Sequence, residues 1–71
     1  MNSKLLRSFM VLYGDTNKSL AAFLDRSEQI VCKKINDNGS EFTQGEIAMI
    51  KTRYNLTPEQ VTDIFFSEKV S

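Results

Sequence analysis

The stretch SLAAFLDRSEQIVCKKIND, residues 19–37, contains two short apolar-striped segments separated by one polar break at residues 25–27. The apolar positions that recur at helical spacing are Leu20, Ala21, Leu24, Val31 and Ile35. This pattern predicts a helix near residues 17–24, a three-residue turn, and a second helix over about 28–37 capped by Ser27. Two helices of this length joined by such a turn match the helix-turn-helix motif.

One further helix is predicted before this stretch. Apolar side chains recur at helical spacing over residues 3–13, and Gly14 follows where a helix commonly ends. Asp15 and Thr16 are then N-cap candidates for the helix near residues 17–24. The apolar residues of the first helix are Leu5, Leu6, Phe9, Met10 and Tyr13.

Two more helices are predicted after the stretch. Thr43 and Glu46 have the spacing of a capping box, which predicts a helix over about 44–54. Thr57, Pro58 and Gln60 supply a cap, a proline at the first helical position and a reciprocal side chain, which predicts a helix over about 58–66. No segment alternates as a strand would, so we expect an all-α, five-helix domain. The residues expected in its core are Leu20, Leu24, Val31, Ile35, Ile47, Ile50, Tyr54 and Ile64.

Composition restricts the class of protein. A chain of 71 residues forms one domain with one core. There is no histidine, and Cys32 is the only cysteine, so we expect no nucleophilic catalysis and no metal site. We also expect no cofactor, because a chain of this length has no room for a ligand domain. The longest uninterrupted apolar run at the amino terminus is residues 9–13, far short of the ~20 residues of a membrane span. We therefore expect a cytoplasmic protein that is not an enzyme.

The arrangement of helices resembles the Cro/repressor (XRE-type) helix-turn-helix family of bacterial and phage regulators. The resemblance covers most of the chain, and the block EFTQGEIAMIKTRYNLTPEQVTDIFF, residues 41–66, is similar to small phage-borne members. It implies a compact lambda-repressor-like fold over residues 1–71 and a regulator of transcription that binds double-stranded DNA. It also implies a homodimer in the cytoplasm of a bacterial or phage-infected cell.

The resemblance also implies which residues meet DNA. The helix after the turn would be the recognition helix, with Gln29 able to pair with adenine and Ile30 able to contact a thymine methyl group. The residues that would face base edges are Ser27, Glu28, Gln29, Ile30 and Lys33. Those that would contact the DNA backbone are Asn17, Lys18, Asn38, Gly39, Ser40, Thr43 and Gln44.

The sequence departs from the family pattern at three positions. Asp25 occupies the usual glycine position in the turn, where a left-handed backbone is expected. Glu28 places a carboxylate where polar or basic side chains are commoner, and Asp37 replaces a glycine that often follows the recognition helix.

Charge supports the nucleic-acid hypothesis only through its distribution, because nine basic and nine acidic residues give a net charge of zero. Residues 1–37 carry six basic and four acidic side chains, whereas residues 38–71 carry three and five. The half that contains the motif is therefore the positive half, as phosphate binding requires.

A second hypothesis belongs to a different class of function. The same fold serves in protein binding, and an antirepressor would use this surface to sequester a partner repressor. Glu28, Ile30, Cys32 and the balanced charge suit a protein partner. Of the adjacent Phe65 and Phe66, the first is expected in the core and the second at a partly exposed edge, available to a dimer partner. The alternative is that both pack beneath the first helix.

Overall fold

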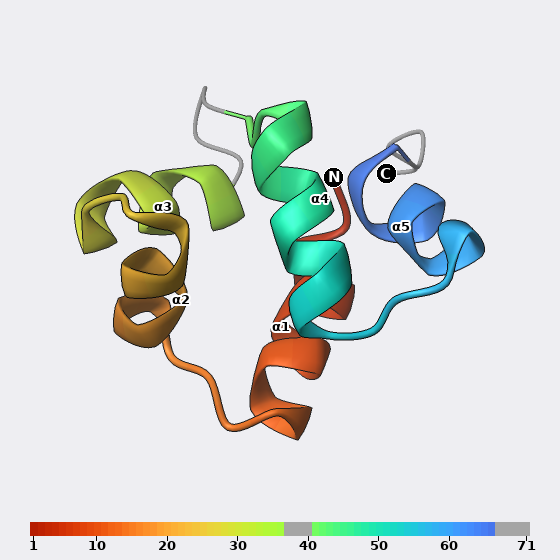
Figure 1. Ribbon diagram of the computed structural model, residues 1–71, viewed down its shortest axis with the longest axis horizontal. Helices are drawn as coiled ribbons and strands as arrows, with labels where there is room; N and C mark the ends of the chain where they lie inside the picture. The colour runs from red at the N-terminus through yellow and green to blue at the C-terminus, as the bar shows by residue number, and fades with distance from the viewer. Residues whose placement is uncertain (37–40, 67–71) are drawn as a thin grey trace.

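Five helices make up the part of the chain that the structure describes, residues 1–36 and 41–66 (Figure 1). In this computed structural model they are α1 (Ser3–Leu12), α2 (Asn17–Leu24), α3 (Glu28–Ile35), α4 (Gln44–Arg53) and α5 (Pro58–Phe65). No strand occurs among these residues, so the predicted all-α fold is confirmed. Helices α1, α4 and α5 each end one residue earlier than predicted. Helix α3 ends at Ile35, and Asn36 is its C-cap.

Each of the last four helices begins at a hydroxyl side chain that accepts a hydrogen bond from the backbone N–H three residues later. The N-caps are Thr16, Ser27, Thr43 and Thr57. The predicted capping boxes of α4 and α5 are confirmed, and α2 has a third, formed by Thr16 and Ser19. Of the two candidates for the start of α2, Thr16 is the cap and Asp15 is not.

Three helices end in the same left-handed turn. After α1, Gly14 has φ 73°, and the N–H groups of Gly14 and Asp15 donate to carbonyls of α1. Asp25 ends α2 with φ 59°, and Asn55 ends α4 with φ 51°. These are Schellman turns, in which a residue with positive φ lets the following N–H reach back to an unpaired carbonyl. The expected left-handed conformation of Asp25 is confirmed.

The core is one cluster of apolar side chains contributed by all five helices. Seven of the eight residues expected there are buried, and Ile47 is the exception, because it is half-buried at the edge of the cluster. Phe42 and Leu56 join the core from the segments that lead into α4 and α5. Figure 1 shows α4 between the α2–α3 pair on one side and α5 on the other, so α4 lies next to both.

The paired phenylalanines at the end of α5 have different environments, as expected. Phe65 packs against the core, with its ring edge-on to Phe42 at a centroid distance of 5.8 Å. Phe66 is 58% exposed. In the described part of the chain, no helix is both long and apolar enough to cross a membrane.

Core truncation tests this packing. Val31 and Ile35 are fully buried, so Val31→Ala should lower the free energy of unfolding by about 1–3 kcal/mol and Ile35→Ala by about 2–4 kcal/mol. Leu12→Ala is the matched control, because Leu12 is exposed and its truncation should change stability by less than about 0.5 kcal/mol. Urea unfolding followed by circular dichroism measures all three, and equal losses for Ile35→Ala and Leu12→Ala would contradict the assigned core.

Candidate nucleic-acid interface

Helix α3 presents a row of polar side chains away from the core. Val31 and Ile35 are fully buried on one side of the helix. Gln29 and Lys33 are exposed on the opposite side, one turn apart, as residues separated by four positions must be. Glu28 is also exposed, and Ile30 is 44% exposed. Four of the five residues predicted to face bases are therefore side chains of α3 that solvent reaches.

Ser27, the fifth predicted base reader, has a structural role as well. Its Oγ accepts a hydrogen bond from the N–H of Ile30 at 3.2 Å, which caps α3. Because a hydroxyl also carries one donor, Ser27 can still donate to an acceptor outside the helix. Thr43 has the same constraint at α4, where its Oγ1 accepts from the N–H of Glu46 at 3.2 Å.

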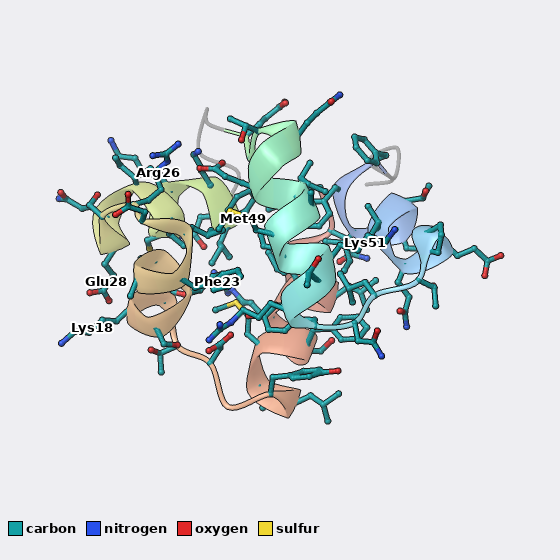
Figure 2. All side chains as sticks on the ribbon, in the orientation of Figure 1. Lys18, Phe23, Arg26, Glu28, Met49 and Lys51 are labelled. Carbon is teal, nitrogen blue, oxygen red and sulfur yellow. The ribbon has the colours of Figure 1, made fainter. Side chains whose placement is uncertain are left out.

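The residues predicted to contact the DNA backbone lie in three places. Asn17 and Lys18 form the first turn of α2, where Asn17 is half-buried and Lys18 is exposed. Thr43 and Gln44 are exposed at the start of α4. The predicted contacts Asn38, Gly39 and Ser40 lie outside the described residues, as does Asp37. Figure 2 shows Lys18 and Glu28 at the same end of the molecule, on α2 and α3.

A buried carboxylate joins three segments next to this surface. Glu46 is 4% exposed, and its Oε2 accepts from Nε of Arg26 at 2.8 Å. Its Oε1 accepts from Nζ of Lys34 at 2.7 Å and from the backbone N–H of Thr43 at 2.9 Å. The turn before α3, the body of α3 and the start of α4 thus meet at one side chain. Sequence reasoning assigned Glu46 only to a capping box, and no local signal indicates its other two partners.

The protonation state of Glu46 follows from these contacts. Burial by itself would raise the pKa of the carboxyl, but the hydrogen bonds from Lys34, Thr43 and Arg26 outweigh it. The pKa falls from 4.5 to about 2. Glu46 is therefore ionised throughout the physiological range, and both cations remain paired with it.

A second buried carboxylate holds the start of α2. Both carboxylate oxygens of Asp15 accept from the guanidinium of Arg53, at 2.6 and 2.7 Å, and Oδ2 also accepts from the hydroxyl of Tyr54 at 2.6 Å. The hydroxyl of Ser19 donates to Oδ1 at 2.8 Å. The hydrogen bond from Arg53 is the main reason that the pKa of Asp15 lies well below its usual range. Asp15 was predicted as an N-cap candidate, and its side chain instead links α2 to the end of α4.

Helix α1 holds the other end of α3. The hydroxyl of Ser3 donates to the backbone carbonyl of Ile35, and the guanidinium of Arg7 donates to the side-chain carbonyl of Asn36. Helix α3, which carries the exposed face, is thus fixed at its N-terminal turn, along its length and at its C-terminus.

The described residues offer no candidate metal site. Among them, no group of three or more histidine, cysteine, aspartate or glutamate side chains is placed to hold a metal ion. Comparison of the chain with protein-family models, with curated proteins and with solved structures finds no match. The functional hypothesis therefore depends on the geometry and chemistry of the α3 surface.

Acid should weaken the fold through Glu46. Its pKa is lower in the folded state than in the unfolded chain, so as pH falls the unfolded state takes up a proton first. The stability that Glu46 contributes is complete above about pH 5 and declines as pH falls toward 2. Glu46→Gln should be less stable than the parent at pH 7, and the difference should shrink on acidification. Thermal unfolding of both proteins across this range measures it, and a constant difference would contradict the assignment.

Proposed function

We propose that the chain is a sequence-specific DNA-binding regulator of transcription, similar to the Cro/repressor helix-turn-helix proteins of phage or prophage origin. The observation that carries the proposal is the division of α3 into two faces. Val31 and Ile35 are fully buried, and Gln29 and Lys33 point away from them on a short helix that is capped and held at both ends. A helix of this kind fits the major groove, which admits an α-helix and carries a distinct pattern for each base pair.

In the proposed complex each exposed side chain has a defined chemical role. The carboxamide of Gln29 pairs with N6 and N7 of an adenine, and the ammonium of Lys33 reaches a guanine or the backbone. Ile30 contacts a thymine methyl group. Asn17 and Lys18 bind phosphates at the start of α2, where the positive end of the helix also attracts an anion. Occupation of promoter DNA by the protein then regulates transcription.

A homodimer on a palindromic operator is part of this proposal. Two copies related by a two-fold axis read two half-sites, and their combined binding supplies affinity that one small domain lacks. Phe66 supports a contact between copies, because it exposes a large apolar ring at the end of α5.

A second candidate function is capture of a partner repressor by the same face of α3. The exposure of both Ile30 and Glu28 in the first turn of α3 favours it, because a protein partner can offer an apolar contact to one and a cation to the other. Both functions use the same residues, so the location of the surface does not distinguish them and a binding measurement must.

Base reading by Gln29 is tested on an operator selected from a random duplex pool with the parent protein. Gln29→Ala should lose about 1–3 kcal/mol of discrimination at one base pair and bind other sites nearly as before. Lys18→Ala should weaken binding to all sequences alike and lessen its dependence on salt. Fluorescence anisotropy at several salt concentrations measures both. If both variants bind as the parent does, with unchanged stability, the recognition face is wrongly assigned.

Glu28 separates the two candidate functions. In a major groove its carboxylate is repelled by phosphates unless it accepts from N4 of a cytosine, whereas a protein partner needs only an opposing lysine or arginine. Glu28→Gln should therefore strengthen non-specific DNA binding if the protein is a DNA reader. For an antirepressor it should weaken capture of a co-encoded repressor instead. Tight binding of the parent to a repressor, with no DNA binding at low salt, would overturn the proposed function.

A further inference from the structure

Arg26 is the basic residue closest in sequence to the start of α3, and its backbone is fixed. Its N–H donates to the carbonyl of Ala21 at 3.0 Å, which closes the turn after α2. The next residue, Ser27, caps α3. The side chain of Arg26 therefore starts from a defined point between the two motif helices, although it was not among the residues predicted to contact DNA.

The side chain of Arg26 is held as well. Its Nε donates to the buried Oε2 of Glu46 at 2.8 Å, yet 47% of the side chain is exposed. A guanidinium has five N–H donors in a rigid fork, and Glu46 accepts only from Nε of Arg26. The Nη groups of Arg26 can therefore bind a second acceptor. One of them lies 3.5 Å from the carbonyl of Asp25, at the limit of a hydrogen bond.

The charges around Glu46 do not cancel at the surface. Lys34 and Glu46 form a close ion pair whose side chains are only 12% and 4% exposed. This pair is internally neutral and lies largely out of solvent. The charge of Arg26, the second cation of the cluster, is therefore not neutralised within the cluster, and its attachment to Glu46 limits where that charge lies. The exposed carboxylate of Asp25 is the nearest opposite charge in the same turn.

We propose that Arg26 binds a phosphate of the DNA backbone beside the recognition helix and that Glu46 is the positioning residue that orients its guanidinium. The inference rests on the proposed function, since it names a further contact of the same DNA surface. The paired N–H donors of a guanidinium match two oxygens of a phosphate, whereas a lysine ammonium offers only a point charge. Because Arg26 is already ordered, binding costs it less side-chain entropy than it costs an unrestrained cation.

Figure 2 gives the geometry for a matched control. Arg26 lies at the α2–α3 end of the molecule, together with Lys18 and Glu28, whereas Lys51 lies on the side of α4 that faces α5. Lys51 is also exposed. Arg26→Gln and Lys51→Gln thus each remove one positive charge, but only the first removes it from the proposed interface. Arg26→Lys keeps the charge and loses the fork that contacts Glu46 and phosphate together.

The experiment measures the dissociation constant for the selected operator duplex against salt concentration, with folding checked by circular dichroism. Arg26→Gln should bind roughly tenfold more weakly, and its log–log salt slope should fall by about one, the value for one lost phosphate contact. Lys51→Gln should bind nearly as the parent does. Arg26→Lys should recover the salt slope but not the full affinity.

The possible results distinguish this inference from the function on which it rests. If the parent binds DNA and Gln29→Ala loses base discrimination, but Arg26→Gln and Lys51→Gln behave alike, the inference is wrong and the proposed function stands. Full recovery of affinity in Arg26→Lys would overturn the positioning role of Glu46. If the parent binds no duplex even at low salt, both the inference and the proposed function are wrong.

Discussion

The carboxylate of Glu46 is the interaction on which the α3 surface depends. It accepts hydrogen bonds from the turn before α3, from α3 itself and from the backbone at the start of α4. An isolated carboxylate at 4% exposure would be strongly unfavourable, but two cations and one N–H group offset its desolvation. Removal of any partner leaves charge poorly matched in a largely buried place. The position of α3 relative to α4 is therefore set by directional contacts as well as by apolar packing.

The two ends of α4 use the same kind of attachment. At its end, Arg53 and Tyr54 donate to Asp15, which directly precedes the cap of α2, and Arg53 also stacks over Phe23 of α2 at 4.5 Å from the ring centroid. With Glu46 near its start, α4 is linked to the α2–α3 pair at two separated points. Two such links oppose rotation of the pair on the core, which a single link would permit. A helix that reads base edges, as proposed for α3, needs this restraint because contacts with base edges depend on its orientation.

Much of the fold is encoded in signals that act over a few residues. The hydroxyl caps at Ser27, Thr43 and Thr57, and the apolar spacing of residues 20–35, specify where helices begin and which side is buried. These signals also placed Gln29 and Lys33 on the outer side of α3. Such local signals are enough to predict which side of a helix is buried, because the helical periodicity is fixed.

Contacts between distant residues were not predicted, for a physical reason. Arg26 and Lys34 reach Glu46 across 20 and 12 residues, and Arg53 reaches Asp15 across 38, so neither cluster leaves a local pattern. Asp15 resembles a cap because aspartate is a good cap residue, and only the tertiary position of Arg53 assigns it elsewhere. Ile47 follows the apolar stripe of α4 but lies where the core ends, which depends on how α5 packs.

The central claim is that the outer face of α3 and the turn before it form the DNA-binding surface. The most direct test is to titrate the isotopically labelled protein with a short mixed-sequence duplex at low salt and follow its backbone amide NMR signals. The account predicts that the signals that shift most belong to Lys18, to residues 26–30 and to Lys33, with little change in α5. Shifts centred on α5 or on the end of α1, or no shifts at all, would contradict it.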